Sequence, residues 1–437
     1  MTFLKYFLAF VVLSIVIFIH EFGHFIIAKA SGVVVEEFSI GMGPRLFKFT
    51  RKGTMYSLKL FFFGGSCRMK GEDDPEAEDT EGSFQSASWG RRFAIIAAGP
   101  LFNFLLAFVL SIILIGKAGY DPCIVYRVTE DSAAEEAGLM AGDTILKMDK
   151  TSTVFYGDYS MFVYALDAED GDELTLTVKR DGEKLTLTYP ITYVDKDVYQ
   201  MGVYLYSDEP VIASVVEDTP AEEAGLCAED RVLSVDGTEV ETSSDISALV
   251  QECNGNAITL VILRGEEELT LTFTPTLAHT SYYDLGFTLS GERIMVSPLK
   301  TVGYAFEEVG YWIRSVFTSF KLMFAGKVSA NDVSGPVGIV SAIGDVVEEA
   351  AEDGGLYVFL NLLNWCVMIS ANLGVMNLLP IPALDGGRLL FLLVELVFRK
   401  PVPKDKEAIV NVVGFILLMV LMVVIMFNDI RKLIFGI

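Results

Sequence analysis

Two histidines and a glutamate stand in an apolar stretch close to the start of the chain, SIVIFIHEFGHFIIAKA (14–30). His20 and His24 are four residues apart, so on an α-helix they share one face. This spacing lets two imidazoles bind one zinc ion while the intervening glutamate, here Glu21, acts as general base. Ionisable side chains in a membrane helix are costly and usually functional. The motif therefore predicts a catalytic zinc site rather than a polar helix end near the headgroups.

A catalytic zinc ion takes three protein ligands and keeps one position open for water, so a third ligand is needed. The remaining histidine, His279, lies in a strongly acidic segment outside the apolar regions. Two carboxylates in apolar sequence are candidates: Asp385 in NLLPIPALDGGRLL (377–390), and Glu395 ten residues later. Asp385 is favoured because prolines and glycines break the chain around it, and irregular backbone at membrane depth is found where it lines a cavity. The alternative role for Asp385 is a helix N-cap.

Four stretches are long and apolar enough to cross a bilayer, which takes about 20 residues. Three are continuous, at roughly 3–28, 92–116 and 408–427. The fourth, near 356–380, is interrupted by asparagines. The apolar run that follows it, GGRLLFLLVELVF (386–398), is expected to form a partial or re-entrant helix.

Basic residues in short loops mark the cytoplasmic side of a membrane protein. Ten of them lie from Lys29 to Arg92 and five from Arg388 to Lys406, so both loops are predicted to be cytoplasmic. Residues 117–355 hold 43 of the 58 acidic residues and 15 of the 33 basic ones, and they are expected on the opposite side. The acidic balance, a net charge of −25 for the chain, argues against nucleic-acid binding.

Four segments resemble, in order along the chain, the site-2 protease family of intramembrane zinc proteases. They are HEFGH (20–24), AAGPLFNFLLA (97–107), NDVSGPVGIV (331–340) and NLLPIPALDGG (377–387). The resemblance covers nearly the whole chain and is strongest to the bacterial regulator of sigma-E protease subgroup, which has tandem PDZ domains. It implies that His20, His24 and Asp385 bind Zn²⁺ and that Glu21 is the catalytic base.

The resemblance also implies residues that hold the substrate. Asparagines of the third span bind the substrate backbone in the family, and here Asn377 is the best match and Asn372 the next; their alternative role is helix packing through amide hydrogen bonds. The segment MYSLKLFFFGGSCRMKG (55–71) reads as a strand pair. In the family such a segment forms a membrane-dipping sheet whose edge pairs with unfolded substrate, which assigns Leu58 and Leu60 to the pairing strand.

One further asparagine, Asn103 in the second span, is expected to serve helix packing rather than catalysis.

The acidic insert contains an internal repeat, in which SAAEEAGLMAGDTILKMDK (132–150) aligns with TPAEEAGLCAEDRVLSVDG (219–237). Alternating strand sequences with hairpin turns follow each copy. The repeat resembles two tandem PDZ domains of the permuted bacterial type. In the second copy Gly202 lies in MGV, which resembles the loop that receives a terminal carboxylate; the first copy shows no clear equivalent. Replacement of the first copy's Gly142 by Glu229 weakens the turn signature of the second, and both copies could be size filters or spacers.

The predicted fold is a multi-pass α-helical membrane protein of about four spans, with an inserted α+β tandem PDZ-like region and a cytoplasmic, membrane-associated β-hairpin or sheet. Residues 1–120 and 356–437 are expected to form the two halves of the membrane core. The two PDZ-like domains are expected at 121–198 and 199–290. Residues 291–355 are expected to hold an amphipathic helix and a connecting segment, with the helix on the outer membrane face or packed against the PDZ pair.

The expected function is intramembrane zinc endopeptidase activity on transmembrane segments of single-span membrane proteins, such as anti-sigma factors or signal-peptide remnants. The expected location is the bacterial cytoplasmic membrane, with the active site near the cytoplasmic face and the PDZ-like domains outside. The expected partners are these substrates, membrane lipids and peptide chain ends. Two alternatives stay open: a membrane-anchored zinc protease that cuts exposed loops of misfolded proteins, and a non-catalytic membrane PDZ scaffold.

Overall fold

The computed structural model describes residues 2–72, 80–206, 209–216, 218–328, 333–400 and 402–435. The chain divides into two compact units. The first, which we call the helical unit, combines Met1–Ile124, Thr144–Leu166 and Leu289–Ile437. The second, which we call the strand unit, combines Val125–Asp143 and Asp167–Thr288. The first two residues of the segment NDVSGPVGIV lie outside the described residues.

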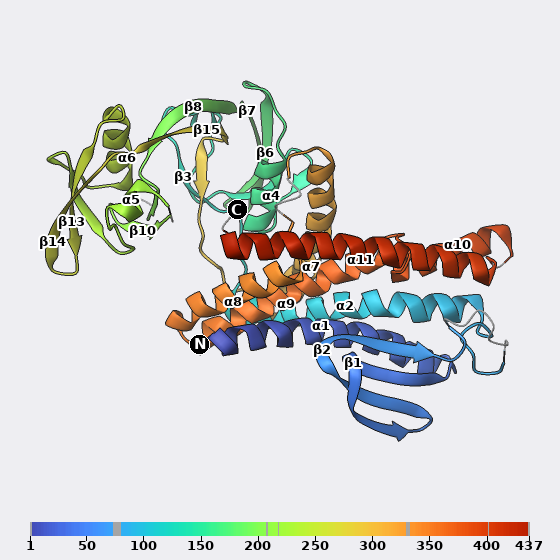
Figure 1. Ribbon diagram of the computed structural model, residues 1–437. Coiled ribbons are helices and arrows are strands. Elements are labelled where there is room, and N and C mark those ends of the chain that lie inside the picture. The colour runs from blue at the N-terminus through green and yellow to red at the C-terminus, as the bar shows by residue number, and fades with distance from the viewer. Residues whose placement is uncertain are drawn as a thin grey trace. The chain divides into compact units, whose positions relative to one another are not determined.

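Four helices in the described part of the chain are long and apolar enough to cross a membrane, which confirms the predicted spans. They are α1 (Thr2–Ala30), α2 (Trp89–Ala118), α9 (Gly355–Leu378) and α11 (Lys404–Phe435), all in the helical unit (Figure 1). The apolar run after the third span forms α10 (Asp385–Phe398). Its 14 residues extend about 21 Å, which is less than the hydrocarbon thickness of about 30 Å.

Small side chains let α1 and α2 approach closely. A Cβ atom added at Gly23 of α1 would collide with the carbonyl oxygen of Ala98 in α2. Helix α9 packs on the same part of α2, where the Ser370 hydroxyl donates a 2.8 Å hydrogen bond to the backbone oxygen of Asn103. Lipid provides little hydrophobic drive for helix association, so close backbone approach and hydrogen bonds of this kind hold membrane helices together.

The amphipathic helix is α7 (Pro298–Phe324), and it packs on the apolar helices as well as on α4 (Tyr156–Ala165). Val309 of α7 shares one buried cluster with Ala107 of α2 and with two residues of α9. On the other side, Arg314 donates a 2.9 Å hydrogen bond to Asp158 of α4. The sequence allowed a surface helix or a helix packed on the PDZ pair, and the structure adds the contact with two spans.

The segment SGPVG begins helix α8 (Pro336–Asp353), and α11 caps its N-terminus. Asp429 of α11 accepts hydrogen bonds from the backbone N–H groups of Gly335, at 3.0 Å, and Gly338, at 2.8 Å. An anionic side chain at this position satisfies amide groups that have no partner within the helix.

The aromatic segment belongs to a larger sheet made by β1 (Val35–Arg51) and β2 (Thr54–Met69). Both strands bend, so residue Ile40 of β1 lies opposite both Leu58 and Gly65 of β2, and Phe47 also lies opposite Leu58. The sheet therefore runs, in spatial order, through segments 45–51, 54–59, 35–40 and 65–69.

This order corrects the prediction that the strand of Leu58 supplies the free edge. Leu58 has strand neighbours on both sides, so its backbone groups already pair within the sheet. Leu60 is exposed and follows the last residue of this inner segment. Among the described residues the edges are 45–51 and 65–69, because 55–71 contributes two non-adjacent segments rather than one hairpin.

A buried charge fixes the bend of this sheet. Glu37 accepts two hydrogen bonds from Arg45, at 2.9 and 2.7 Å, and one from Ser57 at 2.7 Å. The Arg45 guanidinium lowers the pKa of Glu37 to about 2, against the opposing effect of burial. The ion pair thus joins segments 35–40, 45–51 and 54–59.

The strand unit carries the second copy of the internal repeat and residues 132–143 of the first. Each copy holds a buried aspartate against an arginine of the hairpin that follows it. Arg180 bonds to both oxygens of Asp143 at 2.7 and 2.6 Å, and Arg264 bonds to both oxygens of Asp230 at 2.7 Å. The turn that the sequence made uncertain is retained, because Glu229 adopts φ +68°, close to the φ +89° of Gly142.

The second copy combines strands with a helix, as a predicted α+β domain requires. The second copy forms a sheet of order β12-β11-β13-β14 beside α6 (Ser243–Glu252), with a separate pair β9–β10. The strand bounds are β6 (Glu173–Arg180), β7 (Glu183–Pro190), β9 (Val203–Leu205), β10 (Ile212–Val215), β11 (Arg231–Val235), β12 (Thr238–Glu239), β13 (Ile258–Arg264) and β14 (Glu267–Phe273).

A two-stranded ribbon, β8 (Thr192–Gln200) with β15 (Thr276–Asp284), carries the chain to the second copy and back (Figure 1). After the ribbon, β16 (Phe287–Leu289) pairs with β3 (Val125–Val128) of the first copy. The second copy is therefore an insertion within the first, and the expected boundary near residue 290 assigns β16 to the wrong copy.

This insertion supplies the loop that the sequence did not reveal in the first copy. Gly286, at φ +75°, accepts a 2.9 Å hydrogen bond from Thr129 N–H, and the Ser132 hydroxyl lies 3.4 Å from its carbonyl oxygen. Gly202, at φ +89°, accepts from Val216 N–H at 2.8 Å in the second copy, with the Thr219 hydroxyl at 3.4 Å. The segment LGF (285–287) is thus the counterpart of MGV (201–203).

A buried carboxyl on α7 makes the stability of the helical unit depend on pH. Burial raises the pKa of Glu308 to about 7, against a lowering effect of the Ser111 hydroxyl. The folded state therefore keeps a proton that the unfolded chain releases above its ordinary pKa, so this group reduces stability as pH rises from about 4.5 to 7. We expect Glu308→Gln to remove this loss, measured as thermal unfolding in detergent at pH 5 and pH 8.

The matched control is Glu307→Gln, which removes an exposed carboxyl from the neighbouring position. It is expected to keep the wild-type difference between the two pH values. An equal pH response of both variants would contradict the assignment to Glu308.

Candidate metal centre

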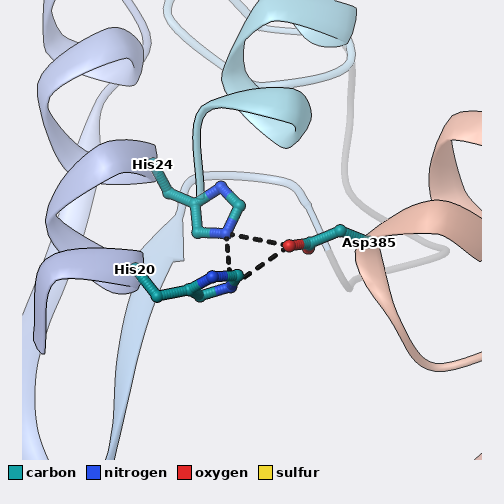
Figure 2. Close-up of side chains that lie close together, drawn as sticks. All are labelled: His20, His24 and Asp385. Carbon is teal, nitrogen blue, oxygen red and sulfur yellow. Dashed lines mark hydrogen bonds and ion pairs between the residues drawn. The ribbon is translucent and has the colours of Figure 1, made fainter. Parts of the chain in front are cut away.

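His20, His24 and Asp385 converge on one point (Figure 2). His20 Nε2 lies 3.1 Å and His24 Nε2 lies 3.3 Å from Asp385 Oδ2, and the two nitrogens are 3.2 Å apart. His20 is 9% exposed and His24 is 8% exposed. In the part of the chain that the structure describes, this is the one cluster of metal-ligating residues found.

The three distances test whether zinc fits. Four ligands on a tetrahedron with bonds of about 2.0–2.1 Å are separated from one another by about 3.3 Å. The observed separations of 3.1 to 3.3 Å match three corners of that tetrahedron. Two imidazoles and one carboxylate also form a recognised catalytic donor set that leaves the fourth corner open. The site therefore fits a zinc ion without rearrangement.

The start of α10 directs the carboxylate of Asp385 toward the histidines. Asp385 is the first residue of the helix, Leu384 occupies the N-cap position, and no side chain caps this end. The alternative in which Asp385 acts as an N-cap is therefore not what the structure shows. The competing ligand, Glu395, pairs instead with Arg92 at 2.6 Å.

Hydrogen bonds from α2 orient both imidazoles. His24 Nδ1 lies 2.9 Å from the backbone oxygen of Ile95, which can only accept, so Nδ1 carries the proton and Nε2 is free to bind metal. His20 Nδ1 lies 3.3 Å from the side-chain amide of Asn103.

For His20 to bind metal through Nε2, its Nδ1 must also carry a proton, and the amide oxygen of Asn103 must accept it. That oxygen is buried without a partner when the amide nitrogen faces the ring. The two amide ends are interchangeable by a flip, which places the oxygen against Nδ1–H. Asn103 is thereby a partner of His20, whereas the sequence suggested only helix packing.

Gly99 of α2 makes room for the two rings. A Cβ atom at this position would collide with His24 Nε2 and lie 2.8 Å from His20 Cε1. The structure therefore explains on steric grounds why the segment AAGPLFNFLLA has glycine at this position, which the sequence alone does not explain.

Glu21 lies beside the edge segment of the sheet. It is half-buried, and a Cβ atom added at Gly65 would lie 2.9 Å from Glu21 Cγ and 3.2 Å from the backbone oxygen of Ser39. The edge 65–69 thus has a residue beside the proposed base, and that residue is Gly65, the second glycine of FFFGGSC.

The two asparagines of the third span lie on α9 without a hydrogen bond to the cluster among the described residues. Asn372 has a buried Oδ1 atom without a partner, and Asn377 is half-buried. Five helical residues correspond to a rotation of about 140°, so the two side chains leave the helix in different directions. Their substrate-binding role stays a prediction.

These features define a membrane protein with a zinc centre and PDZ-like domains, and comparisons with known proteins identify its family. Residues 8–421 match the model of peptidase family M50. The chain is 33% identical over 450 residues to the regulator of sigma-E protease RseP of Escherichia coli, covering 97% of each chain. It is 30% identical over 431 residues to the zinc metalloprotease RasP of Bacillus licheniformis, covering 95% of this chain and 96% of the relative.

A solved structure of the HtrA3 PDZ domain bound to a phage-derived ligand aligns with 20% of this chain and 93% of that chain, at 15% identity and a TM-score of 0.18.

The match to the family model and to the curated relatives settles the class of enzyme. The chain belongs to peptidase family M50, the site-2 protease family, and is a zinc metalloprotease.

Adding one methyl group at Gly99 is expected to disrupt the zinc site. Gly99→Ala pushes the added carbon into both imidazoles, so zinc affinity in detergent should fall by roughly 100-fold or more, measured by competition with a chelator. Gly90→Ala is the matched control, since no atom lies within 4 Å of its added carbon. Wild-type zinc affinity in Gly99→Ala would show that the rings do not occupy these positions in the loaded enzyme.

Proposed function

We propose that this protein cleaves transmembrane segments of single-span membrane proteins, in regulated intramembrane proteolysis. The observation that carries the proposal is the buried convergence of His20, His24 and Asp385 on helices of the membrane core. A site on a span helix receives a substrate that is itself in the membrane more readily than a loop of a soluble protein.

In the proposed reaction, bound zinc supplies Lewis acidity toward water and the scissile carbonyl. Glu21 takes a proton from the attacking water and later gives it to the leaving amine. Gly99 and Asn103 hold the imidazoles in place, and low exposure of the histidines strengthens each electrostatic interaction at the site.

The substrate must be extended at the scissile bond, because the backbone carbonyl groups of an α-helix are engaged in hydrogen bonds within the helix. We propose that an unwound segment adds as a strand to the edge 65–69, which lies beside Glu21. Backbone pairing would explain how one site accepts different sequences. Asn377 and Asn372 of α9 are proposed to contact the same substrate, with Leu60 and the side chain of Leu58 lining its path.

The names of two relatives suggest the substrate class. One is the regulator of sigma-E protease of Escherichia coli, and the other is the regulator of sigma-W protease of Bacillus subtilis, 29% identical over 438 residues. We propose, by this likeness, that membrane-bound anti-sigma factors are substrates. The bacterial cytoplasmic membrane, with the zinc site near the cytoplasmic face and the PDZ-like copies outside, is the location proposed from the distribution of basic residues.

Both PDZ-like copies are proposed to receive peptide chain ends at the loops of Gly202 and Gly286. In each loop the glycine adopts positive φ and its carbonyl oxygen accepts a backbone hydrogen bond from the same copy. A terminal carboxylate would bind to backbone N–H groups of the loop, and at Gly286 it would take the place of Asp284, whose Oδ1 accepts a 2.9 Å hydrogen bond from Gly286 N–H. The chain end would be one that an earlier protease exposes on a trimmed substrate.

Replacing Glu21 separates metal binding from catalysis. Glu21→Gln is expected to keep stoichiometric zinc and to lower cleavage of a single-span substrate by roughly 10²- to 10⁴-fold, the usual contribution of a general base. Cleavage in proteoliposomes would be measured together with zinc content, and products would be mapped by mass spectrometry. Glu349→Gln, which alters an exposed glutamate of α8, is the matched control.

The same experiment discriminates the alternatives. Product ends mapped to an exposed loop would favour the membrane-anchored protease of misfolded proteins. Undiminished cleavage in Glu21→Gln would exclude Glu21 as the base.

A free C-terminal carboxylate is expected to increase the affinity of a peptide for the PDZ-like copies. A peptide ending in an apolar residue is expected to bind the full-length protein in detergent at least tenfold more tightly than the same peptide with an amidated end, because the loops offer N–H groups to a carboxylate. Isothermal titration provides the measurement. Equal affinity of the two peptides would indicate that the copies act as spacers or size filters.

A further inference from the structure

The loop that precedes Asp385 contains a residue in an uncommon conformation. Ala383 has φ +73°, in the left-handed region that residues with a Cβ atom rarely adopt. The loop reaches α10 two residues later, at Asp385 itself. A backbone held in this way persists only where its surroundings determine it.

Helix α11 provides those surroundings. Asn411 Oδ1 accepts a 3.3 Å hydrogen bond from the backbone N–H of Ala383. Three residues later, and on the same face of the helix, a Cβ atom added at Gly414 would collide with Pro382 Cβ and lie 2.8 Å from the Pro382 oxygen. The last span therefore touches two consecutive residues of this loop.

These contacts stand out because α11 is otherwise little covered. Six per cent of the residues in its most apolar stretch are buried, against 44% in α2. With so few buried residues, apolar contacts alone do not hold α11 firmly against the other helices in lipid. Polar side chains in such an exposed membrane helix are costly and are usually functional. Asn411 and, at the other end, Asp429 are two polar side chains through which α11 bonds to the rest of the unit.

We propose that Asn411 is a positioning residue for the zinc ligand Asp385, an inference that rests on the proposed role of Asp385. By accepting from Ala383 N–H, Asn411 keeps that residue at positive φ, and this fixes the direction in which the chain enters α10. Without the bond, Ala383 relaxes toward negative φ, and the carboxylate of Asp385 moves away from the two imidazoles.

The test compares zinc affinities of full-length variants in detergent by competition with a chelator, alongside the visible absorption of the cobalt-substituted protein. Asn411→Leu is expected to weaken zinc binding about 10- to 100-fold, the usual effect of losing a partner that orients a ligand. Asn411→Asp, which keeps an acceptor oxygen, is expected to stay close to wild type. Asn361→Leu is the matched control, since Asn361 bonds only to the backbone of its own helix turn among the described residues.

A second substitution distinguishes positioning from helix packing. Glycine adopts positive φ without a steric penalty, so Ala383→Gly in the Asn411→Leu background is expected to restore most of the zinc affinity and the cobalt spectrum. If Asn411→Leu fails to fold, Asn411→Ser with and without Ala383→Gly gives the same comparison.

Unchanged zinc affinity in Asn411→Leu, or a loss that Ala383→Gly does not repair, would overturn the inference while leaving the proposed function intact. Wild-type protein that binds no stoichiometric zinc would instead overturn the proposed function itself.

Discussion

The structure depends on three ligand atoms held about 3.2 Å apart in a site shielded from water. Two imidazole nitrogens and a carboxylate oxygen at this spacing repel one another through their lone pairs unless a cation or a proton lies between them. Burial adds a desolvation cost for the Asp385 carboxylate. A zinc ion removes both costs at once, because it accepts a lone pair from each atom. The arrangement is thus one that a metal stabilises and that an empty apolar core would not retain.

In the surrounding membrane helices, small and polar residues rather than large apolar ones hold the three ligand atoms in this arrangement. Gly23 brings α1 against α2, Gly99 leaves space for the rings, and Asn103 and the Ile95 carbonyl fix their tautomers. Since lipid tails are as apolar as leucine, contacts of this kind supply the specificity that hydrophobic burial supplies in soluble proteins. The helices α9, α10 and α11 then complete the site from the far end of the chain.

Much of this was predictable from sequence because the signals are local. Apolar length predicts the spans, four-residue spacing predicts the histidine pair, and proline and glycine around Asp385 predict a break in the helix. The internal repeat predicts two related domains, and the structure shows in each the same aspartate–arginine pair. The spans, the histidine pair and the break at Asp385 are each encoded in one continuous stretch of sequence, and the repeat is recognised by aligning its two copies.

The features that the sequence did not predict depend on pairing between distant segments. Residues 55–71, rich in aromatics, indicate strands but not which segments lie beside them. The family resemblance therefore places Leu58 on a pairing edge, although it lies inside the sheet. Gly286 completes the first PDZ-like copy only because the second copy is inserted before it. The contacts of Gly99 and Asn103 with the histidines arise from the crossing of two helices, which no periodicity encodes.

X-ray absorption spectroscopy of the purified protein in detergent would show whether His20, His24 and Asp385 together hold one zinc ion. We expect one zinc per chain, a shell of nitrogen and oxygen at about 2.0–2.1 Å with the multiple-scattering pattern of two imidazoles, and loss of that shell in Asp385→Ala. A shell containing sulfur, a single imidazole, or a spectrum unchanged in Asp385→Ala would contradict it.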